Sequence, residues 1–420
     1  MFKKHDHSKL VPGALDITMT QLGRAGLFIM ILRIACAYKR TMFYLLRKRG
    51  LRAVLKFLYV KIFVPTGEGA GAAFYFMFGW LIRRFPKLAP FPRYVEIETT
   101  TVCNRKCIMC EHTYWKDQEV RHLSFDEFKK TVDQFPKLTW VNLTGEGAAF
   151  LNKDNLKMIK YLKDKDTPVF LVDHFEDIDK ETGRELIKMN VDGLFISMDA
   201  ATKETYEKIK VGCNFDRVLE NIRNFIELKQ EMKSPIPEIC FRYIINSLNV
   251  HELPQYLDLV HSFGTRKWLG DGSHVEFVGL LEFPQVKHLQ ISEIPENIIK
   301  EVMKKKREYD IHVLFSHTKS LSKNPSINTC LCWLEPYIIM GGYVLPDCAV
   351  IMSNQRGYLR KTSFGCVFEK LFKEIWNSER YRKFRQTVNN PNAKVPLSCR
   401  GCRAFDTTER EKKYGIDETL

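Results

Sequence analysis

Three cysteines lie close together on one segment of the chain, at spacings that suit a metal centre. Cys103, Cys107 and Cys110 are separated by three and then two residues within Tyr94–Trp115. Thiolates in such runs hold iron–sulfur clusters, and three protein ligands leave one coordination position open, as catalytic centres require. A zinc loop is the alternative, but it needs a fourth Cys or His at ligand spacing, and His112 follows Cys110 too closely. The pattern favours an iron–sulfur cluster.

The segment that leads into these cysteines begins a series of alternating strand and helix patterns. Such alternation predicts an α/β fold whose parallel sheet has right-handed crossovers. Six units fall short of a complete eightfold barrel, so we predict a partial, open (β/α)6 barrel with its chemistry at the C-terminal ends of the strands. The expected strands are 94–98, 140–144, 169–172, 193–198, 239–245 and 274–278, and the expected helices are 124–134 (opening with a capping box), 155–163, 179–189, 216–231 and 253–263.

The cysteine loop, placed directly after a strand, resembles the signature loop of the radical S-adenosylmethionine (radical SAM) enzymes. In that family three cysteines hold a 4Fe–4S cluster, and S-adenosylmethionine chelates the fourth iron through its amino and carboxylate groups. The reduced cluster cleaves the cofactor to a 5′-deoxyadenosyl radical, which abstracts hydrogen from the substrate. The resemblance implies Cys103, Cys107 and Cys110 as metal ligands, Met109 as a cofactor contact, and a reductant such as ferredoxin or flavodoxin as a partner.

The second expected strand ends in Thr144-Gly145-Glu146-Gly147, which resembles the Gly-Gly-Glu-Pro motif of the family. That motif binds the amino group of S-adenosylmethionine, and the resemblance implies cofactor binding by these four residues. Glycine permits a close approach of the backbone, and carbonyl groups with a carboxylate can receive an ammonium. Here Thr144 replaces the first Gly and Gly147 replaces the Pro, so a plain strand-to-helix turn is the alternative.

Two later segments, 196–199 and 205–210, resemble the Ser-x-Asp-Gly and Tyr-Glu-x-Ile-Arg segments of similar enzymes. In those enzymes the Ser touches the ribose or carboxylate of the cofactor, and the Arg pairs with its carboxylate. The resemblance therefore implies cofactor binding by Ser197, Asp199 and Lys210. Lys210 stands in place of the Arg, and lysine keeps the charge but loses the bidentate fork.

Two further residues are candidates for catalytic roles. The family often shows Thr-Asn-Gly after the third strand, whereas this chain has Val172-Asp173-His174. His174 is thus a candidate general acid or base, and a solvated loop histidine is the alternative. Cys213 is a candidate hydrogen donor, although Cys213 and Cys240 also suit the role of small buried apolar residues.

Six more cysteines lie in the last third of the chain, around an apolar hairpin pattern that resembles the SPASM or twitch extension of a radical SAM subgroup. A full SPASM domain carries two auxiliary clusters and needs seven or eight cysteines. Only six are present, so the resemblance implies one auxiliary 4Fe–4S cluster, and a zinc site with the same ligands is the alternative. The expected ligands are Cys332, Cys348, Cys399 and Cys402, with Cys330 as the alternative to Cys332 and Cys366 as a non-ligand.

The N-terminal region carries nearly all of the net charge of +15. Residues 1–90 contain 16 Lys or Arg and 3 acidic residues, which gives +13. Residues 22–64 have the pattern of one or two basic amphipathic helices broken near Gly50, and the uncharged run 70–82 is too short for a transmembrane helix of about 20 residues. We therefore expect residues 22–84 to bind a membrane surface. A helical subdomain packed on the enzyme is the alternative, and no nucleic-acid partner is expected.

These features predict three parts: a basic helical region over 1–92, a radical SAM barrel over 93–315, and a SPASM/twitch-like region over 316–420. The expected function is a radical SAM enzyme that abstracts hydrogen from an unactivated carbon, in the cytoplasm and peripheral to the inner face of the cell membrane. The basic, apolar N-terminal region favours a lipid or isoprenoid-type substrate. The alternatives are an enzyme that modifies a peptide or sugar, as a maturase, dehydrogenase or epimerase, and a non-enzymatic iron–sulfur or zinc protein that docks on membranes.

Overall fold

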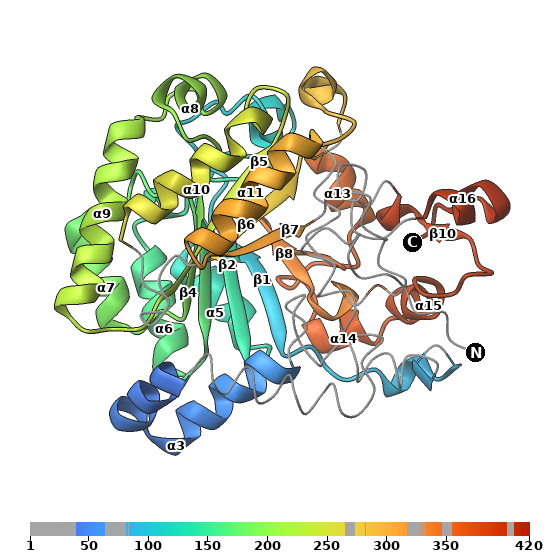
Figure 1. Ribbon diagram of the computed structural model, residues 1–420. Helices are drawn as coiled ribbons and strands as arrows, with labels where there is room; N and C mark the ends of the chain where they lie inside the picture. The colour runs from blue at the N-terminus through green and yellow to red at the C-terminus, as the bar shows by residue number, and fades with distance from the viewer. Residues whose placement is uncertain are drawn as a thin grey trace, which may run out of the picture.

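One sheet forms the centre of the computed structural model, which describes residues 39–63, 81–82, 84–264, 274–281, 283–316, 330, 332–346, 355–400 and 407–420. Seven parallel strands follow one another across this sheet in chain order (Figure 1). The six predicted strands are present within one residue of their expected ends, and β7 is a seventh that was not predicted. The strands are β1 (Tyr94–Glu98), β2 (Trp140–Thr144), β3 (Val169–Asp173), β4 (Gly193–Ser197), β5 (Glu238–Ile245), β6 (His274–Gly279) and β7 (His312–Ser316).

Both faces of the sheet are covered, as in other parallel sheets. All five residues of β1 are buried. Val95 and Ile97 belong to the large core between the sheet and its helices. Tyr94, Trp140 and Phe170 point to the opposite, inner face, where they form a separate aromatic cluster, and the Trp140 and Phe170 rings stack at 3.5 Å. The alternation of side chains thus separates an outer hydrophobic core from an inner face.

Helices in the crossovers cover the outer face of the sheet (Figure 1). The five predicted helices are all present, and the predicted capping box at Ser124 is formed with Glu127. Two helices that the sequence patterns did not predict, α8 and α11, complete this layer. The helices are α5 (Phe125–Val132), α6 (Asn155–Asp164), α7 (Lys180–Lys188), α8 (Lys203–Ile209), α9 (Phe215–Glu231), α10 (Leu253–Ser262) and α11 (Glu296–Glu308).

The C-terminal region continues the same sheet. The predicted apolar hairpin consists of β8 (Tyr337–Ile339) and β9 (Tyr343–Leu345), and β8 pairs in parallel with β1. The remaining elements pack beside this edge of the sheet (Figure 1). They are α13 (Arg356–Thr362), α14 (Phe372–Trp376), α15 (Glu379–Thr387), α16 (Thr408–Tyr414) and the paired short strands β10 (Val395–Pro396) and β11 (Ile416–Asp417). The predicted division of the chain at residue 315 stays a prediction.

A buried ion pair fastens this region to the end of β1. The side chains of Glu98 and Arg356 are both 0% exposed and pair with each other. The same Glu98 oxygen also accepts a hydrogen bond of 2.7 Å from the Met340 amide. The Arg356 guanidinium lies 4.5 Å from the centre of the Trp115 ring, at the end of the cysteine segment. Strand, cysteine segment and C-terminal region therefore meet at one buried charge pair.

Helix α3 (Lys39–Phe63) lies across the N-terminal ends of the strands (Figure 1). Gly50 has φ +79 and interrupts its helical geometry, so the predicted break near Gly50 is confirmed. Of the segments expected to bind membranes, residues 22–38 and 64–80 lie outside the described residues. Among the residues that the structure does describe, none of the helices combines the length and apolarity needed to cross a bilayer.

Candidate active site

The cysteine loop leaves β1 at the C-terminal end of the strand and is held by the segment that follows α8. The Lys106 amide donates to the Val211 carbonyl at 2.8 Å, and the Ile108 amide donates to the Ile209 carbonyl at 2.9 Å. On the other side, the Thr101 hydroxyl donates to the Glu119 carbonyl at 2.7 Å. These bonds fix both flanks of the loop that carries the three cysteines.

Cys103, Cys107 and Cys110 are all half-buried, and none of them forms a disulfide with another described cysteine. Burial raises the pKa of the Cys103 thiol, and burial together with the nearby Glu146 carboxylate raises the pKa of Cys110 well above its ordinary range. Metal ligation needs thiolates, so cluster binding must release the protons that these thiols hold. Three thiols on one loop, with no competing disulfide among the described cysteines, fit a cluster with one open position.

The motif at the end of β2 packs against this loop. Glu146 accepts a hydrogen bond of 3.5 Å from the Cys110 thiol. A Cβ added at Gly147 would lie 2.4 Å from the Thr100 carbonyl oxygen, and one added at Gly145 would lie 2.7 Å from a carbon of a β1 side chain. Both glycines are therefore required by close packing. The structure thus brings Thr144, Gly145, Glu146 and Gly147 together with the cysteine loop.

Three other predicted cofactor contacts form one buried group at the end of β4. The Lys210 ammonium lies 2.9 Å from an Asp199 carboxylate oxygen and donates to the Ser197 carbonyl at 2.9 Å and to its hydroxyl at 3.2 Å. Burial opposes the charge of Lys210, but Asp199 outweighs it, and the pKa of Lys210 is held well above its ordinary value. The other Asp199 oxygen accepts from the Ile244 amide at 2.6 Å. Lys210 thus holds Ser197 and Asp199 in place.

Met109 lies inside a hydrophobic cluster with Ile209 and Phe283, and its side chain is 6% exposed. Its sulfur accepts a hydrogen bond of 3.8 Å from the Asn246 side chain. The Met109 side chain is therefore a packing group in this structure, and contact with a cofactor would have to use its main chain.

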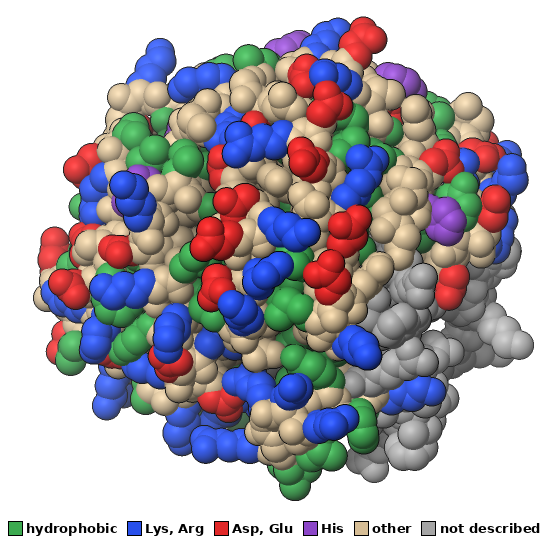
Figure 2. Space-filling view, turned by 90° about the vertical axis from the view of Figure 1, so that its left-hand side faces the viewer, with side chains coloured by type: hydrophobic (Ala, Val, Ile, Leu, Met, Phe, Trp, Pro, Cys, Tyr) green, Lys and Arg blue, Asp and Glu red, His purple; other side chains and the backbone are tan. Residues whose placement is uncertain are grey.

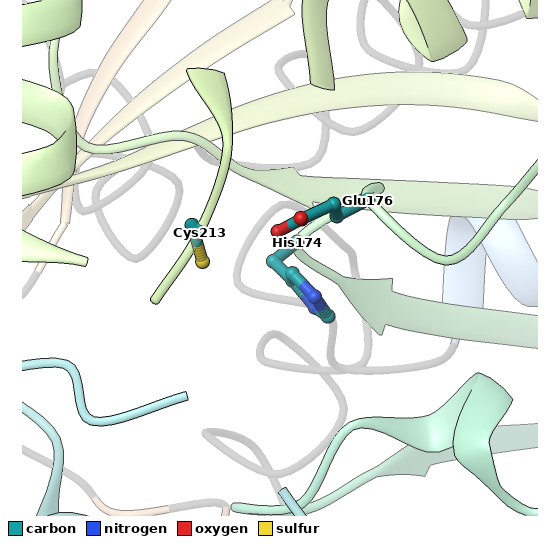
Figure 3. A group of neighbouring side chains, drawn as sticks. All are labelled: His174, Glu176 and Cys213. Carbon is teal, nitrogen blue, oxygen red and sulfur yellow. The ribbon is translucent and has the colours of Figure 1, made fainter. Parts of the chain in front are cut away.

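The two candidate catalytic residues come from different elements and meet in space (Figure 3). His174 follows β3, and Cys213 lies in the turn before α9. Ligand-type atoms of His174, Glu176 and Cys213 lie within 4.8 Å of one another. Figure 3 shows the Glu176 carboxylate pointing toward Cys213, with the His174 ring beside it. The structure therefore brings His174 and Cys213 together, whereas their chemical roles stay predictions.

A charge network surrounds this trio and involves residues that the motifs did not indicate. Arg105, inside the cysteine motif, pairs with Glu176 at 3.1 Å and with Asp177 at 3.0 Å. His174 lies 3.3 Å from Asp177 and 3.6 Å from Asp173. Burial opposes the charge of His174, but the two aspartates outweigh it and raise the pKa of His174. Because Arg105 already neutralises Glu176, the trio is better described as part of an ion-pair network than as a cation site.

The predicted auxiliary ligands are only partly described. Cys348, Cys402 and the side chain of Cys332 lie outside the described residues. Cys399 and Cys330 are both buried at 7% exposure, and Asn389 holds the Cys330 main chain through bonds of 2.7 and 2.8 Å. The Cys366 thiol donates to the Gly341 carbonyl at 3.2 Å. The set of auxiliary ligands stays a prediction.

Comparison with known families agrees with the geometry of both regions. Residues 97–257 match the model of the radical SAM superfamily, and residues 296–403 match that of the iron–sulfur cluster-binding domain SPASM. The chain belongs to the radical SAM superfamily and is a radical SAM enzyme with a C-terminal SPASM region. The two matches cover the partial barrel and the region that extends its sheet.

Individual relatives are distant. The tungsten-containing aldehyde ferredoxin oxidoreductase cofactor-modifying protein of Pyrococcus furiosus is 25% identical over 350 residues, which cover 77% of this chain and 91% of that protein. The crystal structure of Streptococcus suis SuiB bound to S-adenosylmethionine has a TM-score of 0.58 at 13% identity and covers 92% of this chain and 88% of its own. The structure of anSMEcpe with bound AdoMet has a TM-score of 0.54 at 14% identity. The match covers 78% of this chain and 88% of the anSMEcpe chain. These structures establish the fold alone.

Proposed function

We propose that this radical SAM enzyme modifies a peptide or protein substrate. The observation that carries the proposal is a pair of charged side chains on the inner face of the sheet, at the end nearer the candidate active site. Arg242 lies between Phe241 and Tyr243, which are fully buried in the outer core, so its side chain points to the inner face. There it donates to Glu276 at 2.8 Å and lies 4.5 Å above the Phe195 ring.

The part of the inner face that carries these charged and amide groups suits a polar substrate better than an acyl or isoprenoid chain. Arg242 is aligned with Ser197 across β4 and β5, so the charge pair reaches the level of the predicted cofactor contacts. Nearer the other end, Asn142 donates to Glu96 at 3.0 Å. A hydrocarbon chain placed here would remove charged groups from water without offering hydrogen bonds, which is costly. Peptide amides and carboxylates can bond to these same groups. The expected lipid substrate therefore gains no support.

The proposed substrate class also agrees with the fold neighbours. SuiB has been solved bound to the precursor peptide SuiA, at a TM-score of 0.56 and 12% identity to this chain. Native anSMEcpe has been solved with AdoMet and the Cp18Cys peptide, at a TM-score of 0.51. These peptides belong to those proteins, and we extend only the class of substrate to this chain.

We propose the following roles for the cluster-binding and cofactor-binding residues. Cys103, Cys107 and Cys110 would hold the 4Fe–4S cluster, and that cluster with S-adenosylmethionine supplies the radical that abstracts hydrogen when both are bound. The turn at Glu146 would receive the amino group of the cofactor. Lys210 fixes Ser197 and would contribute positive charge near the cofactor carboxylate.

On the substrate side we propose His174 and Cys213 as donors. His174 would hold or pass a proton at its ring nitrogens, because two aspartates favour its charged form. Cys213 would offer the hydrogen of its thiol. Cys332, Cys348, Cys399 and Cys402 would hold one auxiliary cluster, although SPASM regions often hold two. A reductant such as a ferredoxin or flavodoxin completes the proposed set of partners.

A deuterium-transfer experiment tests the substrate class. Extract from fully deuterated cells of the source organism is divided into protein and peptide, lipid, and small-molecule fractions. Each fraction is incubated with the reconstituted enzyme and S-adenosylmethionine. We expect deuterium in 5′-deoxyadenosine only with the protein and peptide fraction, and we expect protease digestion of that fraction to remove the signal. The variant with alanine at all three loop cysteines is the control. Transfer from the lipid or small-molecule fraction would overturn the proposal.

A further inference from the structure

The inner side of α3 is fixed to the end of the barrel that lies farthest from the cysteine loop. Arg49 forms an ion pair with Asp166, and the Tyr44 hydroxyl donates to Asn190 at 3.0 Å. Leu45 and Ala53 pack on Ile236, and the Lys56 ammonium lies 3.7 Å from Asp166. The partners Asp166, Asn190 and Ile236 lie in the turns that enter β3, β4 and β5. Helix α3 thus packs against this end of the barrel through ion pairs, a hydrogen bond and apolar contacts.

The outer side of α3 carries large apolar side chains in contact with solvent. Phe43, Leu46, Leu51 and Leu55 are 66%, 48%, 63% and 58% exposed. They are four of the ten large hydrophobic residues that are exposed in the described part of the chain. Four large exposed apolar side chains within residues 43–55 of one helix are a candidate interaction surface, whereas single scattered ones need no explanation.

Positive charge surrounds these apolar residues. The 25 residues of α3 include eight Lys or Arg and no Asp or Glu. Lys39, Arg47, Lys48 and Arg52 are exposed as well, within the same stretch of the helix as the apolar group. Figure 2 shows Lys and Arg side chains together with hydrophobic ones along the lower edge of the molecule, where α3 lies. We call this surface, formed by the exposed residues of 39–55, the basal face.

Charge complementarity selects the partner. Exposed cations around large apolar groups are the combination that binds the interface of an anionic bilayer, where headgroups meet the cations and the apolar side chains enter the acyl boundary. A second copy of the chain would bring the same cations together across a two-fold axis. Nucleic acid would pair with the cations but leave Phe43 and the three leucines without a partner.

We propose that the basal face docks on anionic lipid bilayers and turns the active site away from them. The cysteine loop, Glu146 and His174 follow the C-terminal ends of strands, and Ser197 is the last residue of β4. Helix α3 instead contacts the turns that enter β3–β5. A docked enzyme therefore receives its substrate from the aqueous side, and the membrane determines where the enzyme works. The approach of the substrate from the aqueous side rests on the proposed peptide substrate. The docking of α3 on the bilayer does not depend on it.

Vesicle binding of the full-length apoprotein tests the docking without any need for activity. We expect co-sedimentation with phosphatidylcholine vesicles that contain about one quarter phosphatidylglycerol, and much weaker binding to pure phosphatidylcholine. The variant F43S/L46S/L51S/L55S should bind about tenfold or more weakly, because each apolar side chain contributes to insertion. The variant M232S/L371S, which removes two exposed apolar residues elsewhere, should bind like the wild type.

Hydrogen exchange on the same vesicles tests the orientation. Peptides from residues 39–55 should become protected, and peptides from 99–122 and 174–178 should exchange as in free protein. Unchanged vesicle binding by the four-serine variant, or protection at 99–122, would overturn the proposal. So would dimerisation that the four-serine variant abolishes. Deuterium transfer from the lipid fraction would instead overturn only the peptide substrate, so the two failures can be told apart.

Discussion

At the scale of single residues, the fold surrounds His174 with charged partners that the sequence motifs did not indicate. A family pattern indicated the cysteine loop, a departure from a family pattern indicated His174, and Cys213 was a candidate for its residue type alone. The motifs gave no sign of Arg105 or Asp177, which complete the network around His174. Arg105 occupies a spacer position of the cysteine motif, where the pattern allows any residue type. Such partners depend on the approach of two loops, which no local pattern encodes.

The network makes the stability of the protein depend on pH through His174. Its pKa is raised above the ordinary value of 6.5, since Asp173 and Asp177 outweigh burial and the nearby Lys210 charge. The contribution of charged His174 is therefore fully present below pH 6.5 and is lost as pH rises through the folded-state pKa. We expect the His174→Gln variant to lose about 2 kcal/mol of unfolding free energy near pH 5.5, as for a hydrogen bond to a charged group, and clearly less near about pH 8.5.

Urea unfolding of wild type and variant at the two pH values measures this difference. The control is His251→Gln, because the His251 side chain is 65% exposed and the change should matter little at either pH. An equal loss at both pH values for His174→Gln would show that its ion pairs do not stabilise the folded state.

At the scale of elements, sequence patterns predicted the strands but not the contacts between residues that are far apart in the sequence. Short apolar segments between helical patterns predicted six strands within one residue of their ends, because such segments are visible locally in the sequence. Strand β7, which follows the basic helix α11, was missed. The pairing of β8 with β1 joins residues about 240 positions apart, and only the folded chain shows it.

The Glu98–Arg356 pair is the strongest link between β1 and α13. Removing Arg356 leaves a carboxylate buried without its partner, which costs about 3–5 kcal/mol in comparable cases. We expect Arg356→Ala to lower the unfolding free energy by about that amount and to reduce the iron held at the cysteine loop, because Arg356 also covers Trp115.

Denaturant unfolding and iron analysis of the same preparations measure both effects. The matched control is Arg360→Ala on the same helix, whose side chain is 28% exposed and should cost less than about 1 kcal/mol. The double variant Glu98→Gln/Arg356→Met should recover much of the stability. A loss in Arg356→Ala no larger than in the control would refute a structural role for the buried pair.

For the whole molecule, iron content reports how many clusters the chain holds. Anaerobically reconstituted wild type should bind about eight irons, one 4Fe–4S cluster in the barrel and one in the SPASM region. The Cys103/Cys107/Cys110→Ala variant should keep about four and lose all cleavage of S-adenosylmethionine. Wild type that saturates near four irons would favour zinc in the C-terminal region, and wild type near twelve would mean two auxiliary clusters.

The position of α3 in the whole molecule also changes how the basic N-terminal region is interpreted. Charge and apolar patterning predicted a membrane-binding segment, and from it a lipid substrate. Helix α3 lies at the opposite end of the strands from the cysteine loop, so binding to a membrane and reaching into it for substrate are separate questions. Sequence patterns could not distinguish them, because the distance between α3 and the active site is set by the barrel.

The buried pair at the end of β1 cannot form until late in the synthesis of the chain. Arg356 is synthesised 258 residues after Glu98. At about 5–20 residues per second, the ribosome adds that stretch in roughly 10–50 s. Throughout that interval the growing chain lacks the side chain that will pair with Glu98 and cover Trp115. We therefore expect the support that α13 gives to the end of β1 to form only after most of the chain has been made, and a chain cut before Arg356 to lack it.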